Sequence, residues 1–583
     1  MTSFWVELKR RNVVRVTIAY AVVAWLLIQV TETILPLFGF GNTPARIVVI
    51  VLAIGFVPAL IFSWAYELTG EGLKKEKDVD RSQSITHITG RKLDFAIIGV
   101  LTIAVVYFVS EKIFFGDDLA PEGIDKSIAV LPFVNMSGDP DQEYFADGIT
   151  EEILNTLVAI DELQVTGRTS SFTFKDRSDV DLKTIGRMLG VSNILEGSVR
   201  KSGNEVRITA QLITAENDFH LWSETYDREL TDIFKIQEEI ATAIGEALQV
   251  ELGLKVVHSL DGRRTDNPAA YDAYIKGRFW AAKSTGQGWP QAIEHYEEAV
   301  RLDPNFALAH AGLADAYANN ANWGGVPARV AYPKAKQAAD DALRLNPTLA
   351  EAHAAHALVK LFLEWDWEAA DAAFRQALIL NLSNAYAIHQ YGHYLDFIGR
   401  PQESLDVFAD ALALDPLAAF QWTGQAYTLV NMGEFERAGV ALDRALELDP
   451  GLPMRWTVLG MLHDARGEFE EAVSAWERGL SLDTEDPYQR ALLGYGYART
   501  GRVNEAKAML ETLTSTSQPG VGAMDRAIIF AGLGDFDNAF QLLEEALADR
   551  EPWIIGLKID PGFSLMKDDP RYADILERLG IGD

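Results

Sequence analysis

The sequence predicts a multi-domain protein in three parts: three transmembrane helices, then an α/β domain, then an all-α superhelix of two-helix repeats. Three observations lead to this prediction. Three apolar stretches fall within the first 115 residues, the next region switches repeatedly between strand and helix periodicity, and the last region repeats a unit of 34 residues. At 583 residues the chain is also too long for a single hydrophobic core.

The composition excludes several classes of function. A formal net charge of −32 argues against DNA or RNA as a partner, because a nucleic-acid backbone requires a basic protein surface. The chain contains no cysteine, which excludes disulfides, thiolate catalysis and thiolate metal sites. An acidic repeat array is usually a solvated surface, and the alternative is that its charge selects a basic partner.

Residues 1–115 are expected to form a three-span membrane anchor. The stretches 16–35 and 47–66 each contain about twenty residues, enough to cross a hydrocarbon core of roughly 30 Å, and a shorter stretch covers 95–109. A cleaved signal peptide is the alternative for the first stretch, but no small-residue cleavage site follows it.

The distribution of basic residues predicts how this anchor is oriented. Lys and Arg lie before the first stretch and between the second and third, at Lys9, Arg10, Arg11, Arg15, Lys74, Lys75, Lys77, Arg81, Arg91 and Lys92. The loop between the first two stretches holds only Arg46. Because cytoplasmic loops are enriched in Lys and Arg, we expect a bacterial inner-membrane protein with a cytoplasmic amino terminus and periplasmic carboxyl-terminal domains.

After a linker at 116–126, residues 127–255 are predicted to form an α/β domain with a mixed sheet. Residues 127–133 form a short apolar run typical of a buried strand, and a helical pattern follows at 144–160. Two further strand-like runs flank Lys201-Ser202-Gly203-Asn204, a turn with Gly where a positive φ is needed, so they are expected to pair as a hairpin.

A second linker at 256–268 leads to a repeat array of about eight units at 269–548, followed by a capping segment at 549–583. The Leu-Asp steps at Leu414-Asp415, Leu448-Asp449 and Leu482-Asp483 are 34 residues apart. Small residues such as Ala438 and Ala472 recur where paired helices must cross closely. Repeats of this length stack two-helix units and serve to hold partners.

Particular motifs give these regions a family resemblance. The repeat, with Trp456-x-x-Leu459-Gly460, resembles the tetratricopeptide repeat (TPR). The middle region is similar to the TolB amino-terminal domain and its FlgO-like relatives in four stretches: Ile128-Ala129-Val130-Leu131-Pro132-Phe133, residues 144–152, Leu195-Glu196-Gly197-Ser198-Val199-Arg200 and residues 221–228. With its apolar amino-terminal part, the chain resembles proteobacterial membrane-anchored TolB-like proteins with TPR repeats. The resemblance implies an envelope or signalling module that works by contact, and it carries no catalytic activity.

We predict no catalytic, cofactor-binding or metal-binding residue. A metal site is an alternative interpretation of the acidic residues from Asp139 to Glu152. However, acidic residues at the start of a helix also complement the helix dipole, and the residue spacing of a calcium-binding loop is absent. Some proteins that pair TolB-like and TPR regions carry an amino-terminal nucleotide cyclase or winged-helix domain. No catalytic or basic residue here supports either label.

The leading hypothesis is an inner-membrane-anchored, periplasm-facing scaffold that binds a protein or peptide in the concave groove of its TPR superhelix. The alternatives are a signalling adaptor that relays a periplasmic event across the membrane, and an enzyme activity in the TolB-like domain. Groove positions of the first helices give nine candidate contact residues, whose alternative role is packing between repeats: Tyr386, His389, His393, Phe420, Tyr427, Met454, Met461, Tyr488 and Tyr495. The oligomeric state is left open.

Overall fold

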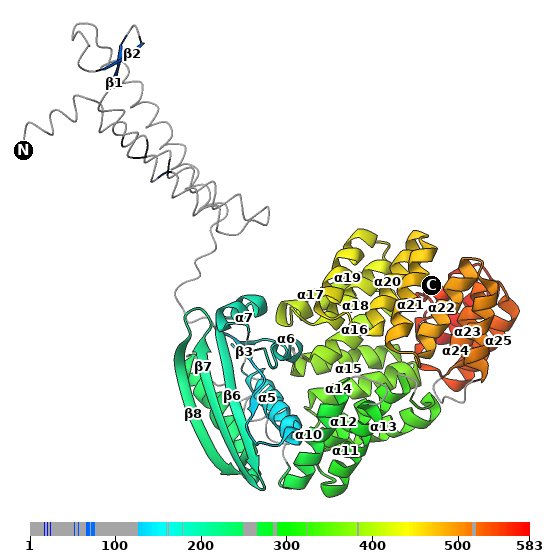
Figure 1. The fold of residues 1–583 in the computed structure, drawn as a ribbon. Helices are drawn as coiled ribbons and strands as arrows, with labels where there is room; N and C mark the ends of the chain where they lie inside the picture. Colours follow the sequence, from blue (N-terminus) through cyan, green and yellow to red (C-terminus); the bar gives the residue numbers. More distant parts are fainter. Residues whose placement is uncertain are drawn as a thin grey trace, which may run out of the picture. The chain divides into compact units, whose positions relative to one another are not determined.

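The computed structural model describes most of the chain from residue 126 onward (Figure 1). Within that region it omits residues 159, 161, 178, 249–264, 284–287, 323–324, 382–383, 516–520 and 583. Before residue 126 it describes only residues 17, 20, 24, 52, 56, 66–69 and 72–75. The chain divides into two compact units, Met1–Gly123 and Ile124–Asp583, which are described separately.

The first unit contains a short antiparallel hairpin of β1 (Tyr66–Thr69) and β2 (Gly72–Lys75). No helix among the described residues is long and apolar enough to cross a membrane, which contradicts the three predicted transmembrane helices. The second predicted stretch ends where the chain enters β1, and most of all three stretches lies outside the described residues. The predicted inner-membrane location, with a cytoplasmic amino terminus and periplasmic domains, depended on these spans. This prediction is therefore also wrong.

The second unit begins with the predicted mixed sheet, which the structure confirms. Its strands are β3 (Ser127–Val130), β4 (Val134–Asn135), β5 (Gln164–Val165), β6 (Asn193–Ser202), β7 (Glu205–Thr214) and β8 (Phe219–Glu229). The order is β5-β3-β6-β7-β8, with β4 also paired to β6. β3 is parallel to β5 and β6, whereas β6, β7 and β8 are antiparallel. The predicted hairpin joins β6 to β7 through Gly203, whose φ of +60° favours glycine.

Helices cover both faces of this sheet around β3. They are α5 (Glu143–Val158), α6 (Arg168–Phe172), α7 (Leu182–Leu189) and α8 (Ile233–Ala247), with one-turn helices η3 (Pro140–Gln142) and η4 (Leu230–Asp232). Successive strand residues point to opposite faces. Ile128 accordingly joins the hydrophobic core that includes α5 and α8, and Ala129 joins a second cluster with Ile185 of α7.

The repeat array consists of helix pairs, which fits the predicted all-α TPR superhelix (Figure 1). The first helices of the units are α10 (Pro268–Ala281), α12 (Ala307–Asn322), α14 (Ala350–Leu358) with η5 (Val359–Glu364), α16 (Ala385–Phe397), α18 (Ala419–Asn431), α20 (Pro453–Arg466), α22 (Pro487–Arg499) and α24 (Ala523–Gly532). Their partners are α11 (Gly288–Leu302), α13 (Ala328–Leu345), α15 (Trp367–Leu380), α17 (Pro401–Leu414), α19 (Phe435–Leu448), α21 (Phe469–Leu482), α23 (Val503–Ser515) and α25 (Phe536–Asp549).

The two helices of the sixth unit, α20 and α21, approach closely because a small residue faces a large one. A Cβ added to Gly460 on α20 would lie 2.2 Å from Nε1 of Trp476, which is fully buried on α21. The Trp476 indole N–H also donates to the backbone oxygen of Thr457 at 3.2 Å. The large ring therefore fixes the separation of the two helices.

The carboxyl-terminal segment contains three further elements: η6 (Pro552–Gly556), η7 (Pro561–Met566) and α26 (Pro570–Leu579). The last helix, α26, lies against α25 through ion pairs of Arg571 with Asp537 at 2.8 Å and of Arg578 with Glu544 at 2.7 Å. The segment therefore extends the repeat array beyond its last helix pair.

Substituting two glycines tests the packing of the helix pairs. We expect Gly460→Ala to lower the free energy of unfolding by about 1 to 3 kcal/mol, because the added methyl group overpacks against Trp476. Gly439→Ala on α19 is the matched control, since no described atom lies within 4 Å of its Cβ position. Removing a helical glycine there should stabilise the protein by about 0.5 to 1 kcal/mol. Urea denaturation measures both, and equal changes would contradict this account.

Candidate protein-binding surface

The first helices of successive units contact one another along the array. α12 contacts α14, α16 contacts α18, α18 contacts α20, and α22 contacts α24. We refer to the surface that these first helices line as the first-helix surface. It is the surface on which the nine predicted contact residues were placed.

The nine predicted residues differ in their exposure. Met454 is exposed, with 37% of its surface accessible, whereas Tyr495 is fully buried and Met461 nearly so. The remaining six are half-buried: Tyr386, His389, His393, Phe420, Tyr427 and Tyr488. Several of the nine therefore take part in packing, and their assignment to partner binding stays a prediction.

His389 and His393 form an aromatic cluster with side chains of neighbouring helices. Their Nε2 atoms lie 3.2 Å apart, so one ring donates a hydrogen bond to the other. Phe420 lies 5.2 Å from His389 and Tyr427 lies 5.5 Å from His393, between ring centroids. Burial lowers the pKa of His389 well below its usual value and that of His393 to about 4, so both rings are neutral near pH 7.

Tyr386 belongs to a polar chain that joins α16 to α12. Its hydroxyl donates to Oδ1 of Asn319 at 2.8 Å and accepts from Nε2 of Gln390 at 2.8 Å. Asn319 in turn donates to Oδ1 of Asp315 at 2.9 Å, and burial raises the pKa of Asp315 to about 7. These hydrogen bonds provide partners for polar side chains that would otherwise be buried between the first helices without any.

The carboxyl-terminal segment lies on the first-helix surface. The Tyr488 hydroxyl donates to Oδ2 of Asp560 at 2.9 Å, and the Tyr495 hydroxyl lies 3.2 Å from Oγ of Ser564. The Trp553 indole donates to the backbone oxygen of Asn322 on α12 at 3.0 Å. In addition, η6 contacts α12 and η5, and η7 contacts α20 and α24. The chain therefore covers part of its own predicted binding surface, which local sequence patterns did not indicate.

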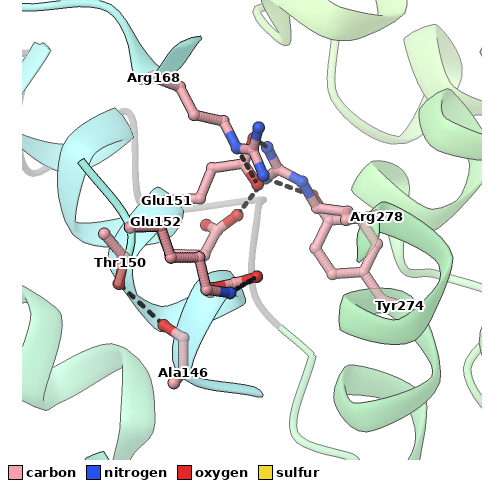
Figure 2. A network of polar contacts seen from close by, with 9 residues as sticks. Ala146, Thr150, Glu151, Glu152, Arg168, Tyr274 and Arg278 are labelled. Carbon is pink, nitrogen blue, oxygen red and sulfur yellow. Dashed lines mark hydrogen bonds and ion pairs between the residues drawn. The ribbon is translucent and has the colours of Figure 1, made fainter. Parts of the chain in front are cut away.

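At its other end the array holds the mixed-sheet domain through a buried ion network. Figure 2 shows Arg278 of α10 and Arg168 converging on Glu151 of α5. Arg278 also pairs with Glu152 and donates to the Tyr274 hydroxyl at 3.1 Å. Burial lowers the pKa of the Arg278 guanidinium. The negative charges of Glu151 and Glu152 have the larger combined effect and raise this pKa well above its usual value.

This network explains two of the acidic residues that the sequence singled out. Glu151 and Glu152 bind Arg278, and Asp147 accepts from Nζ of Lys175 at 2.6 Å. No group of three or more metal-binding side chains was found among the residues that the structure describes. The partner Arg278 lies 126 residues away from Glu152 in sequence, which is why local spacing gave no sign of it.

A second contact joins the mixed-sheet domain to the middle of the array. Asp415, from one of the predicted Leu-Asp steps, accepts a hydrogen bond from the Ser170 backbone N–H at 2.6 Å and so caps α6 from a distant part of the chain. The Ser170 hydroxyl accepts from the Leu417 backbone N–H at 2.7 Å, and the Gly167 backbone N–H donates to the Leu414 oxygen at 2.9 Å. One repeat turn therefore also serves as an interdomain contact.

Family models match three parts of the chain. Residues 286–320 match a TPR repeat and residues 422–452 match a tetratricopeptide repeat, so the array contains TPR repeats. Residues 124–243 match the second domain of HilA/YgeH-like transcriptional regulators. The TolB-like or FlgO-like resemblance and a proteobacterial origin are not shown by these matches. TPR arrays are protein-interaction scaffolds, which implies a protein or peptide partner.

One curated relative and several solved structures are similar to parts of this chain. A Rhizobium meliloti (strain 1021) protein named "Putative adenylate cyclase 3" is 43% identical over 188 residues, which are 32% of each protein. The chain thus spans about a third of that relative's length. PilW, a type IV pilus biogenesis factor, is 21% identical over 36% of this chain and 96% of its own, with a TM-score of 0.30. PilF of Pseudomonas aeruginosa is 20% identical over 35% and 94%, with a TM-score of 0.27.

Removing the central charge of the interdomain network should destabilise the protein. We expect Arg278→Met to lower the free energy of unfolding by about 3 to 5 kcal/mol, because Glu151 and Glu152 lose the buried guanidinium that they share. Replacing both glutamates by glutamine in the same protein should recover most of this loss. Arg301→Met, which breaks the exposed pair with Glu298, is the matched control and should have little effect. Urea denaturation of the four proteins measures this, and an unrescued Arg278→Met would contradict it.

The histidine pair predicts a specific dependence of stability on pH. The folded-state pKa of His393 is about 4, below the unfolded value of about 6.5, so its contribution is complete above pH 6.5 and is lost as pH falls toward 4. His393→Phe should therefore lose less stability than the wild type between about pH 7 and about pH 4.5, by on the order of 1 to 3 kcal/mol.

The exposed His220 supplies the control for this experiment. The variant His220→Phe should follow the wild-type pH profile, because this side chain is exposed to solvent in the folded chain as it is in the unfolded chain. Chemical denaturation at several pH values gives all three profiles. The burial argument is refuted if His393→Phe and the wild type lose stability in parallel.

Proposed function

We propose that this protein recruits a protein partner by binding one of the partner's peptide segments on the first-helix surface of its TPR array. The observation that carries this proposal is the position of the chain's own carboxyl-terminal segment, which already lies on that surface as a peptide ligand would. Side chains of α22 bind Asp560 and Ser564, and main-chain oxygens of α12 and η5 accept from Trp553 and Arg550.

The chemistry of this surface suits a peptide more than a small molecule. Tyr488 and Tyr495 present hydroxyl groups to polar side chains of the segment, while main-chain oxygens at Asn322 and Leu363 receive its donors. These groups belong to three units, and the bound segment extends over more than ten residues. An extended ligand of this length contacts several repeats at once, which is how repeat arrays achieve affinity.

A second candidate function is that of an adaptor in a signalling protein system. The match of residues 124–243 to a domain of transcriptional regulators, and the relative named as an adenylate cyclase, favour a regulatory setting. In this proposal the mixed-sheet domain and the array bind regulatory partners, and the chain itself catalyses nothing. If the purified full chain formed cyclic AMP from ATP, this adaptor proposal would be excluded and the protein would be an enzyme.

Site-specific photocrosslinking in cells tests the proposed binding surface. A benzophenone amino acid in place of Met454, the exposed residue among the nine, should capture a partner protein. Val440 is the matched control, because it is 71% exposed on α19, a second helix of its unit. Adducts at position 454 and not at position 440 are expected. Identical adducts at both positions, or adducts at 440 alone, would overturn the proposal.

A further inference from the structure

The mixed sheet has a long exposed strand at one edge. β8 ends the strand order, so among the described residues no strand pairs with its outer side (Figure 1). We propose that this edge pairs antiparallel with β8 of a second copy of the chain, about a two-fold axis at Thr225. This interface lies on the mixed-sheet domain, so it does not depend on the proposed function of the first-helix surface.

The two edges of this sheet differ. At the opposite edge β5 has only two residues, and the Gly167 backbone N–H just after it donates to the Leu414 oxygen of the array at 2.9 Å. β8 has eleven residues, and all except Trp222 and Tyr226 are exposed. Proteins that remain monomeric protect such edges with short strands, lysine or proline. β8 is long and contains neither residue.

The register determines which backbone groups of β8 point outward. In an antiparallel pair, opposed residues alternately exchange both hydrogen bonds or neither. The Val199 oxygen of β6 accepts from the Met136 N–H at 2.8 Å, so Val199 points its backbone groups away from β7 and from Ile208 opposite it. Ile208 therefore bonds to Tyr226 of β8. Because Tyr226 points toward β7, its neighbour Thr225 points its N–H and C=O to the outer side.

Ser223 and Asp227 share this outward direction with Thr225, because alternate residues of a strand point their backbone groups the same way. The backbone oxygen of Asp227 accepts from the guanidinium of Arg228 at 3.0 Å, so this edge is accessible to a donor. A strand added here would continue the antiparallel ladder of β6, β7 and β8.

The side chains of β8 complement those of a second copy. In the proposed register Thr225 lies opposite its own counterpart, and the residues on either side of it pair by their chemistry. The pairs are Trp222 with Arg228, Ser223 with Asp227, and Glu224 with Tyr226. They supply a cation–π contact and hydrogen bonds to carboxylates. Because each pair occurs twice about the axis, one surface forms both halves of the interface.

Charge favours this register over its neighbours. Within one copy Glu224 accepts from the Tyr226 hydroxyl at 3.2 Å, and Asp227 accepts from Nε of Arg207 on β7 at 2.6 Å. An axis at Glu224 or at Asp227 would place a carboxylate opposite its own counterpart, and like charges directly opposite one another destabilise a strand pair. An axis at Thr225 avoids both repulsions.

An introduced cysteine tests the axis, because the chain contains no cysteine of its own. In a hydrogen-bonded antiparallel pair the Cα atoms lie about 5.5 Å apart, a separation that suits a disulfide. We expect Thr225→Cys in the full chain to form a covalent dimer on mild oxidation. Val440→Cys, exposed on α19, is the matched control and should stay monomeric. Equal crosslinking at both positions, or none at position 225, would overturn the proposal.

Mixing two variants tests the register. Ser223→Cys and Asp227→Cys should crosslink to each other, because the two positions lie opposite one another across the axis. Each variant alone should crosslink much less, since like positions are then about 13 Å apart along the strands, too far for a disulfide. Efficient crosslinking of either variant to itself would contradict an axis at Thr225.

Sedimentation velocity of the cysteine-free chain measures the dimer without a crosslink. Arg228→Glu removes the cation opposite Trp222 and should raise the dissociation constant of the dimer by about tenfold or more, because the contact occurs twice. Arg437→Glu makes the same change on α19, where Arg437 pairs with Glu434, and should leave the dimer unchanged. A wild type that is monomeric at every concentration, or a dimer that Arg228→Glu does not weaken, would overturn the proposal.

Crosslinking in cells distinguishes a second copy from a different partner at this edge. Thr225→Cys should be recovered as a dimer of the chain itself. Recovery of position 225 joined to another protein, without the self-dimer, would assign the edge to a strand of that partner and would overturn pairing between two copies.

Discussion

The structure depends on one constraint of repeat architecture: a two-helix unit cannot bury its apolar face without a neighbour. Inside the array each unit covers the next, and pairs such as Gly460 with Trp476 fix the spacing. The two ends require other covers. At the first unit α5 packs on α10, where Gly148 lets Ile275 approach so closely that a Cβ would lie 2.3 Å from it. At the last unit α26 and η7 cover α25 and α24.

The two covers differ in their physical chemistry. The first contains a desolvated guanidinium between two carboxylates, a geometry that is costly to break because removing the guanidinium leaves two buried carboxylates without their shared positive charge. Together with the contact of Asp415 and Ser170, it attaches the mixed-sheet domain at two separate points. The second cover buries apolar side chains such as Ile554, Phe563 and Met566 completely, and it adds single hydrogen bonds to tyrosine hydroxyls and main-chain oxygens.

Local patterns in the sequence predicted what local interactions determine. The Leu-Asp steps mark the ends of α17, α19 and α21, because each of these helices ends at the leucine of its own step. The turn at residues 201–204 joins β6 to β7, with Ser202 opposite Glu205. The apolar amino-terminal stretches were misjudged, since hydrophobic length alone does not establish a span. Partners such as Arg278 for Glu151, or Tyr488 for Asp560, are more than 70 residues apart, and periodicity contains no information about them.

The same limit explains why the nine predicted contact residues proved so different from one another. Helix position alone assigned them all to one surface, but position does not tell what lies opposite. His389 and His393 face each other and the rings of α17 and α18, so they support packing. Tyr488 and Tyr495 face a segment that returns from the end of the chain. Tyr488 and Tyr495 therefore pack against the chain itself, whereas Met454 is the residue of the nine that is exposed.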